Sequence, residues 1–387
     1  MVPYGRMDGR VGQTQKPPES VPSPSRRRNG VVLRAKQEEL RFPADAVYDF
    51  VECIFLRAGV EESSARLTAR GLWLASLRGV DSHGLRLIPH YVTALQGGRI
   101  NSHPNFSFER TSPSTGRLDA DHGFGHAAGI RAMRHAIDLA REAGSGHVSV
   151  RNSSHCGAMA YFAFEACRED MIGTAYTHGT PKMHTPNATT KFLGTNPVCL
   201  AAPMASEGPF CYDGSTTLMS ANKIRVYGDR GLELPPGCGA DEQGNETRVP
   251  DEVVQLLPIG DYKGFGIAMI VEILCGLLSG MPAGDSISDM FNDPLSQKRL
   301  RGQFYGALRI DVFEVPERFK ARLQDLAERI RRQPLRDPNT PVQAPGDPEK
   351  AFQADREANG IPITEKDLAQ LESVAEELGI EPPWRAN

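Results

Sequence analysis

Strand-like and helix-like segments alternate along most of this chain, and this alternation most limits the folds that it can adopt. Apolar residues recur at helical spacing in residues 43–59 and 129–142, whereas residues 171–179 and 196–204 carry the dense apolar runs typical of strands. Regular alternation of this kind is typical of α/β proteins, in which helices pack on a central sheet. We therefore predict an α/β fold, and we find no internal repeat.

The composition supports a core that needs neither disulfides nor a structural metal. Hydrophobic residues make up 40% of 387 residues, which is enough to build a sizeable core. The seven cysteines are odd in number and scattered, and none forms a C-x-x-C pair. This spacing argues against a disulfide framework or a zinc site and favours reduced thiols in a cytoplasmic protein. We therefore predict no metal site.

Charge and hydropathy exclude two further classes of partner. The chain has 44 Lys and Arg against 48 Asp and Glu, and only 7% aromatic residues. Nucleic-acid binders usually show a basic excess, so we expect no nucleic-acid partner. The longest apolar stretch runs from Phe265 to Leu278 and is interrupted by Glu272. It is too short to span a bilayer, so it predicts a buried helix and no membrane partner.

Two segments rich in proline differ from the rest of the chain. Residues 1–38 are rich in Pro, Ser and Arg and carry almost no periodic apolar residues, which predicts a disordered tail. Their Arg-rich, acid-poor character also fits an organelle transit peptide or a wrongly assigned start site. Residues 334–348 are again rich in proline and predict an excursion over the surface.

One glycine-rich turn resembles a dinucleotide-binding fingerprint but lacks its context. Gly123, Gly125 and Ala128 match the G-x-G-x-x-A pattern between a strand and a helix. The fingerprint also requires an acidic residue at the end of the next strand, about 20 residues on. That region reads HVSVRN and has none. We interpret the turn as a tight strand-to-helix connection rather than a Rossmann site.

The loop around His83 is the first candidate for chemistry. His83 stands between Ser82 and Gly84, and histidine is the side chain best suited to move a proton near neutral pH. Ser82 could bond the substrate or steady the loop, and Arg86 could hold a substrate carboxylate. The alternative is that His83 only caps a helix and that Arg86 is a solvated surface residue.

A second polar loop, at residues 152–157, offers further candidates. His155 lies there between a strand and a helix and could contact a polar group, although an ordinary helix cap explains the loop equally well. Cys156 next to it suggests a thiolate nucleophile, and hence a hydrolase, as a third functional alternative. Asp213 follows a strand and could orient a catalytic histidine or only cap a turn.

Two glycine-containing segments could bind a phosphate group. Residues 194–197 read GTNP at the start of a strand, where backbone amides and small polar side chains could cradle an anion. Lys263 and Gly264 open the apolar helix, and a lysine beside free helix N–H groups favours anions. The alternatives are a turn and an ordinary helix start.

Six segments together resemble the malate/L-lactate dehydrogenase family, which is unrelated to the Rossmann lactate and malate dehydrogenases. The resemblance covers residues 39–380, and the six segments follow the family's order. They are residues 79–91, 150–163, 192–204, 256–280, 304–311 and 344–350. Each segment is weak alone, but six in order are specific.

The resemblance implies an α/β fold with a non-Rossmann cofactor-binding domain and an NAD- or NADP-dependent oxidoreductase. Such an enzyme moves a hydride between a nicotinamide cofactor and a 2-hydroxy acid/2-oxo acid pair, and the family members are generally homodimers. It also implies a domain division after the tail at 1–38. Residues 39–125 and 290–387 would form a discontinuous helical, substrate and dimerisation domain, and residues 126–289 the NAD(P)-binding domain.

The resemblance also assigns site residues. His83 would be the acid/base, paired with Asp213 and assisted by Ser82, and Arg86 and His155 would bind substrate. The cofactor would contact Gly194, Thr195, Asn196, Pro197, Lys263, Gly264, Gly346 and Asp347.

This chain also departs from the family pattern. Some members carry an Arg four residues after the catalytic histidine, where this chain has Leu87. Such departures keep open a catalytically silent member that serves as a binding or structural protein. The sequence chooses neither the acid, nor the direction, nor between NAD and NADP.

Overall fold

A seven-stranded mixed sheet forms the centre of the computed structural model, which describes residues 40–385. Its strands, in spatial order, are β2 (Ser107–Arg110), β3 (Thr115–Asp119), β4 (Ser145–Ser153), β13 (Arg301–Arg309), β5 (Met171–Thr177), β8 (Val198–Ala202) and β9 (Phe210–Gly214). Only the β3–β4 pair of this sheet is parallel, and the other neighbours are antiparallel. A Rossmann domain has a mostly parallel sheet, so the non-Rossmann α/β prediction is confirmed.

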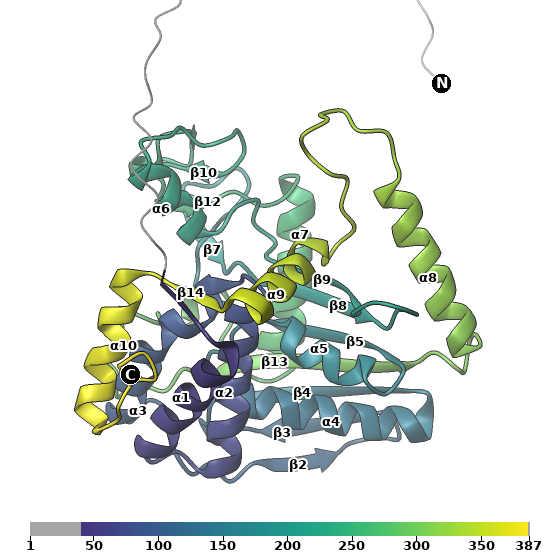
Figure 1. The fold of residues 1–387 in the computed structure, drawn as a ribbon, viewed down its shortest axis with the longest axis horizontal. Helices are drawn as coiled ribbons and strands as arrows, with labels where there is room; N and C mark the ends of the chain where they lie inside the picture. The colour runs from purple at the N-terminus through teal and green to yellow at the C-terminus, as the bar shows by residue number, and fades with distance from the viewer. Residues whose placement is uncertain (1–39, 386–387) are drawn as a thin grey trace, which may run out of the picture. The chain divides into compact units, whose positions relative to one another are not determined.

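Helices cover both faces of this sheet. On one face lie α4 (Gly125–Ala143) and α5 (Ala160–Cys167), and on the other lie α7 (Tyr262–Glu272) and the π-helical η4 (Ile273–Leu277) that continues it (Figure 1). Strand β13 packs closely against helices on both faces of the sheet. A Cβ on Gly302 would lie 1.6 Å from the Cys275 carbonyl oxygen of η4, while Tyr305 packs on Phe162 of α5.

A helical layer forms a second core beside the sheet. It contains α1 (Ala44–Arg57), α2 (Glu62–Leu77), α3 (Ile88–Gln96) and α10 (Glu365–Leu378). The Glu61 carboxylate accepts hydrogen bonds from the first backbone N–H groups of α2 and so caps that helix. Strand β1 (Leu40–Phe42) pairs with β14 (Ile361–Ile363), so residues more than 300 positions apart lie side by side (Figure 1).

The remaining elements form a smaller sheet and an outer helix pair. The smaller sheet contains β6 (Met183–His184), β7 (Lys191–Leu193), β10 (Gly239–Ala240), β11 (Glu246–Thr247) and β12 (Gln255–Leu256), and α6 (Ala221–Asp229) precedes β10. Helices α8 (Pro316–Arg331) and α9 (Asp347–Asn359) flank residues 332–346. Short 3-10 turns lie at Asp81–His83 (η1), Leu85–Leu87 (η2), Pro250–Glu252 (η3) and Gly284–Ser286 (η5).

Several predicted elements are confirmed and one is corrected. The turn at Gly123 does connect β3 to α4, and β8 and β9 do pair as neighbouring strands. The predicted buried helix at Phe265–Leu278 is wrong in part, because only one side of α7 and η4 is buried. The inner side rests on the sheet, and no described element covers the outer side.

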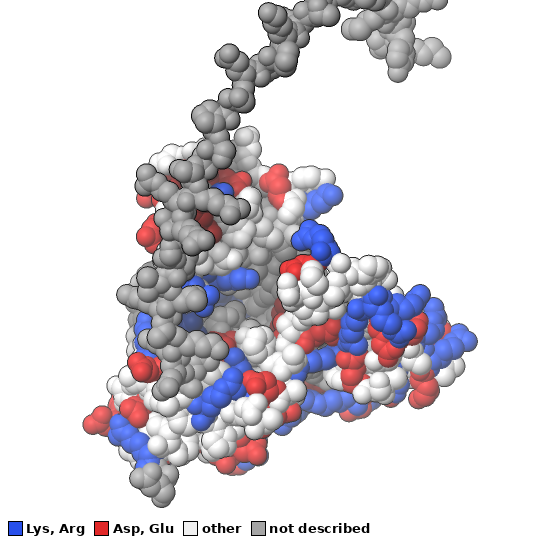
Figure 2. All heavy atoms as spheres, turned by 45° about the horizontal axis from the view of Figure 1, so that its top comes forward, with Lys and Arg blue, Asp and Glu red and all other residues white. Residues whose placement is uncertain are grey.

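The structure also describes the second proline-rich segment and the surface. Residues 334–341 are exposed as predicted, but Ala344 is buried where the segment turns inwards. The predictions for residues 1–38 lie outside the described residues, and the division into two domains stays a prediction. Between residues 40 and 385, no helix combines the length and apolar character needed to cross a membrane. On the face in Figure 2, basic and acidic side chains are interspersed.

Candidate active site

A cavity of about 550 Å³ collects several of the predicted site residues. Its walls come from α2, η1, the start of α5, the end of β9 and the segment that leads into α9. A volume of this size suits a small organic ligand. The predicted residues in its walls are Ser82, His83, Thr195, Pro197, Asp213 and Gly346.

The His83 loop is held by contacts that explain its sequence. Asp81 forms a two-fold ion pair with Arg356 of α9, at 2.5 and 3.0 Å, which anchors η1. A Cβ on Gly84 would lie 2.0 Å from the Ser76 hydroxyl oxygen, so only glycine allows this close approach to α2. The loop therefore presents His83 to the cavity on a fixed backbone.

The ring of His83 is oriented and uncharged. The Ser82 hydroxyl lies 2.8 Å from His83 Nδ1 and fixes the ring's orientation. Burial, together with the positive charge of Lys182, lowers the pKa of His83 to about 4. The imidazole is therefore neutral near pH 7 and able to take a proton.

His155 lies beside His83 although it is not in the cavity wall. The two rings stack with centroids 5.7 Å apart and planes at 18°. The Tyr91 hydroxyl lies 2.5 Å from His155 Nδ1, and burial holds the pKa of His155 well below its usual value. Tyr91 was not singled out in the sequence, and it is a buried residue of α3.

Asp213 shares the cavity with His83 but holds a different partner. Its carboxylate accepts a hydrogen bond of 2.8 Å from the backbone N–H of Ala160, the first residue of α5. Among residues 40–385 no hydrogen bond joins Asp213 to His83, so the pairing of the two in the reaction stays a prediction. Asp213 binds Ala160 because β9 ends at the α5 N-terminus, whose N–H groups are the nearer donors. Burial raises the pKa of Asp213 to about 6.

Asn196 lies beneath the cavity wall rather than in it. Its amide is fully buried, donates to the Ala268 carbonyl at 2.9 Å and to Glu272 at 2.8 Å, and accepts from the Gly179 N–H at 2.9 Å. These bonds hold a strained backbone with φ of 30°. The geometry therefore makes Asn196 a support for its neighbours Thr195 and Pro197, which do line the cavity.

Glu272 is the shared acceptor of this buried network. Besides Asn196, it accepts from His178 Nδ1 at 3.1 Å and from the Gly284 N–H at 3.0 Å. His178 Nε2 accepts from the Gly302 N–H, so its proton lies on Nδ1 and points to the carboxylate. These bonds hold the pKa of Glu272 below its usual value although burial opposes this. The sequence contains one signal for this role of Glu272, namely a charged residue inside an apolar helix.

Three basic side chains near the two histidines were missed in the sequence. Arg299 and Arg301 are buried, and burial lowers the pKa of each, to about 9 and about 10. Within the described chain, Arg299 Nε and Nη1 have no hydrogen-bond partner. Their charges and that of Lys182 lower the pKa of His155 and His83 respectively. Buried, unpaired guanidinium groups favour an anion.

Three other predicted residues stand apart from the cavity wall. Arg86 is exposed on η2, and Lys263 is exposed in the first turn of α7. Gly264 is buried, and a Cβ there would lie 2.4 Å from the Ile259 carbonyl oxygen. Its glycine is therefore explained by packing, and the binding roles of all three stay predictions.

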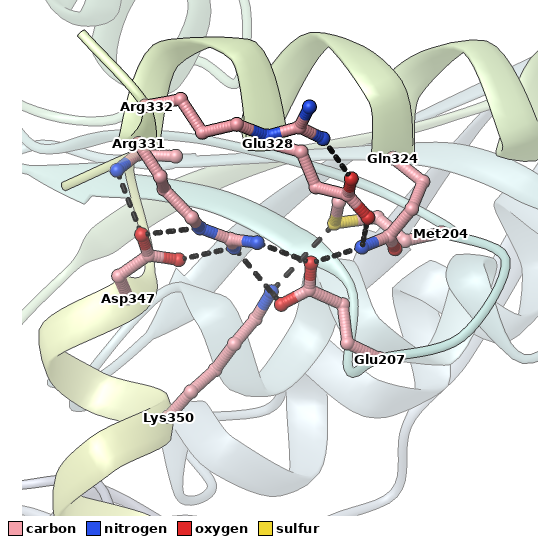
Figure 3. Close-up of polar contacts among 9 residues, drawn as sticks. Met204, Glu207, Gln324, Glu328, Arg331, Arg332, Asp347 and Lys350 are labelled. Atoms are coloured by element: carbon pink, nitrogen blue, oxygen red, sulfur yellow. Dashed lines mark hydrogen bonds and ion pairs between the residues drawn. The ribbon is translucent and has the colours of Figure 1, made fainter.

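Gly346 and Asp347 lie side by side but face different partners. Gly346 has φ of 95°, and a Cβ there would lie 3.1 Å from the Cys211 carbonyl oxygen in the cavity wall. Asp347 instead forms two hydrogen bonds with Arg331 of α8, at 2.6 and 2.9 Å (Figure 3). This ion pair holds the wall, and the predicted cofactor contact of Asp347 stays a prediction.

Cys156 does not fit the alternative of a thiolate nucleophile. The residue is 1% exposed, and burial raises the pKa of its thiol to about 12. A protonated, inaccessible thiol is not a nucleophile at neutral pH. No group of three or more potential metal ligands occurs among residues 40–385.

The chain is similar in sequence to known proteins over most of its length. The model of the malate/L-lactate dehydrogenase family matches residues 42–372. The chain belongs to the malate/L-lactate dehydrogenase family. Malate dehydrogenase of Pyrococcus abyssi is 34% identical over 351 residues, which cover 88% of this chain and 96% of that protein. L-Sulfolactate dehydrogenase of Methanocaldococcus jannaschii is 30% identical, covering 84% and 94%.

Solved structures give the same fold. The sulfolactate dehydrogenase of Methanocaldococcus jannaschii superimposes with a TM-score of 0.83 at 29% identity, covering 88% of this chain and 98% of that one. A malate dehydrogenase of Entamoeba histolytica gives 0.84 at 24% identity, covering 89% and 100%. The protein is accordingly a hydroxy acid dehydrogenase of this family.

Proposed function

We propose that this protein is an NAD- or NADP-dependent oxidoreductase that interconverts a 2-hydroxy acid and a 2-oxo acid, with His83 as the proton acceptor and donor. The observation that carries the proposal is the neutral His83 ring in the cavity wall, oriented by Ser82. Malate and sulfolactate, the acids in the names of similar proteins, are both 2-hydroxy acids.

His83 has the protonation state needed to start the oxidation of an alcohol. With its pKa at about 4 in the ligand-free site, the ring is neutral and takes the hydroxyl proton as the carbonyl forms. In the reverse direction it must first be protonated. A bound carboxylate raises the pKa of a nearby histidine, so an anionic 2-oxo acid promotes the imidazolium form that donates the proton.

We further propose that the substrate carboxylate binds near Arg299 and Lys182 rather than at exposed Arg86. Arg299 is buried with unpaired donors, and Lys182 acts electrostatically on His83. His155 stacks on His83 and keeps the reacting ring from turning. The measurable consequence is a larger rise in substrate KM for Arg299→Met than for Arg86→Met.

The cavity fits a nicotinamide cofactor in two respects. Its size suits a ligand of several rings, and Gly346 and Thr195 bring backbone and small side chains to the wall, where a larger residue at 346 would be strained. When bound, the nicotinamide supplies or accepts the hydride that no side chain can. Thr195, Pro197 and Gly346 would hold it, and the choice between NAD and NADP stays open.

Two expectations rest on other grounds. We propose a homodimer from family membership and a cytoplasmic location from the scattered cysteines, which favour reduced thiols. The alternative of a catalytically silent member is disfavoured, because a silent protein has no physical need for an oriented, neutral His83 beside buried cations.

A spectrophotometric screen of 2-oxo acids with NADH and with NADPH tests the proposal. We expect turnover with at least one pair, and we expect His83→Ala to lower kcat by roughly a hundredfold or more while the variant still binds cofactor. Cofactor binding is followed by nicotinamide fluorescence. Near-normal turnover of folded His83→Ala would remove the proposed role, and absence of cofactor binding in the wild type would favour the silent protein.

A further inference from the structure

A second cavity, of about 530 Å³, lies between α2, α5, α9 and the turn from β8 to β9. Leu74 and Arg78 line both this second cavity and the first one, which holds His83, so the two cavities are neighbours. Among the described residues in its wall, none belongs to the site predicted from the sequence. Its volume is in the usual range of small-molecule sites.

Arg78 places a buried positive charge at the second cavity. The residue is 7% exposed. Its guanidinium lies over the ring of Phe164, 4.8 Å from the ring centroid, and its Nη1 donates a hydrogen bond of 3.2 Å to Gln353 Oε1. Phe164 and Gln353 both line the second cavity and not the first. These two contacts therefore locate the guanidinium at the second cavity.

Arg78 lacks the counter-ion that other cations of this region have. On α8 and α9, Arg331, Lys350 and Arg356 each pair with a carboxylate. Between residues 40 and 385, no carboxylate pairs with Arg78, and Gln353 is its one hydrogen-bond partner. A guanidinium has five N–H donors, and a buried charge is costly unless it is paired. The unfilled donors of Arg78 therefore favour an anionic ligand.

The acidic side chains in the wall do not supply this counter-ion. Glu207 accepts hydrogen bonds from Arg331 at 2.9 and 3.0 Å and from Lys350 at 2.8 Å, so two cations already neutralise it (Figure 3). Glu357 is exposed to water, which weakens its interactions with other charges. The charge of Arg78 is thus the one that the wall leaves uncompensated.

Apolar side chains form much of the remaining wall of the second cavity, among them Leu74, Phe164, Pro209 and Ala354. A planar carboxylate accepts two parallel hydrogen bonds from a guanidinium, and the rest of such a ligand would meet this apolar surface. We propose that the second cavity is a binding site for a small organic carboxylate with an apolar body, held by Arg78.

The position of Arg78 connects the second cavity to the first. Arg78 directly follows α2, and the chain continues from it into the loop that carries His83. An anion bound at Arg78 would therefore act on the backbone that presents His83. The proposal itself rests on burial and charge, so it stands or falls separately from the proposed reaction.

Calorimetric titration of the full chain with benzoate tests the proposal, because benzoate joins a carboxylate to an apolar ring. We expect saturable binding both with and without NADH. Benzamide has nearly the same shape without the charge and should bind about tenfold or more weakly, the scale of a lost hydrogen bond to a charged group. Inorganic phosphate lacks the apolar body and should also bind more weakly than benzoate.

Two variants locate the bound benzoate. Arg78→Met removes the charge and should weaken benzoate binding by about tenfold or more. Ala354→Trp fills the second cavity from α9 and should abolish binding, which keeps the test decisive if Arg78→Met fails to fold. The matched control is Ala358→Trp, an exposed residue of the same helix outside the second cavity, which should bind benzoate like the wild type.

The same titrations can refute the proposed site. Absence of saturable benzoate binding would overturn it, as would equal binding of benzamide or of phosphate. Benzoate binding that NADH removes, or that Ala354→Trp leaves unchanged, would put the carboxylate outside the second cavity and would also overturn the proposal.

Discussion

Replacing Arg331 with Met should loosen one wall of the cavity, because this guanidinium joins three separate segments. It binds Asp347 at 2.6 and 2.9 Å and Glu207 at 2.9 and 3.0 Å, and Lys350 also reaches Glu207 at 2.8 Å (Figure 3). Glu207 lies between β8 and β9, and Asp347 begins α9. The ion cluster therefore fixes the segment that carries Gly346 into the cavity wall.

The expected loss of stability follows from how deeply the three charged side chains of this cluster are buried. The side chains of Arg331, Glu207 and Asp347 are 28%, 23% and 15% exposed. Exposed ion pairs contribute about 0–1 kcal/mol, and breaking a buried pair costs about 3–5 kcal/mol. A value of about 2 kcal/mol for Arg331→Met lies between these limits and lowers Tm by roughly 4 °C.

Calorimetry and steady-state kinetics measure the two effects. We expect the cofactor KM to rise about fivefold or more with kcat within about twofold, because the wall moves but the His83 chemistry does not. Arg331→Lys should recover part of the loss, since it keeps the charge. The matched control is Arg329→Met, whose pair with Asp325 lies on the exposed side of the same helix.

The same ion cluster makes the stability of the protein depend on pH. Hydrogen bonds from Arg331 and Lys350 lower the pKa of Glu207 from 4.5 to about 2. The stabilisation is therefore complete above pH 4.5 and is lost as the pH falls towards 2. The stability difference between wild type and Arg331→Met should shrink over this window. Equal losses for Arg331→Met and Arg329→Met, or an unchanged Tm and KM, would refute the reasoning.

Three further predictions concern the buried supports and the proton acceptor. Gly302→Ala should unfold or strongly destabilise the protein, by about 3 kcal/mol or more in a denaturant titration, because its Cβ would overlap the Cys275 carbonyl; a wild-type midpoint would contradict this. Glu272→Ala should cost about 3 kcal/mol in the same assay, since it strands three donors, whereas Glu272→Gln should cost less. Ser82→Ala should lower kcat about tenfold without changing Tm, because it frees the His83 ring; unchanged kcat would remove that role.

Much of the candidate site could be predicted, because its motifs encode local geometry. The spacing of Ser82, His83 and Gly84 follows from a short turn against α2, and the structure places the first two in the cavity wall. Thr195 and Asp213 also lie there. The role of Asn196 could not be predicted, because its partners Ala268 and Glu272 lie more than 70 positions along the chain.

The missed residues share a physical reason. A guanidinium such as that of Arg299 looks like any surface charge in a sequence, and only its burial with Nε and Nη1 unpaired distinguishes it. The ion pair of Asp347 with Arg331 of α8 was also missed, because the two residues meet only when α8 packs beside α9. Burial and ion pairing both depend on which distant segments become neighbours.

The sequence by itself determined the α/β class and the family, because apolar period and short motifs act within one turn or one strand. The tertiary structure alone decided which side of α7 is covered. Periodicity marks that helix as apolar all round, and this predicts burial without saying against what. Only the position of the sheet shows that one side of the helix packs against this chain and that the other side is exposed.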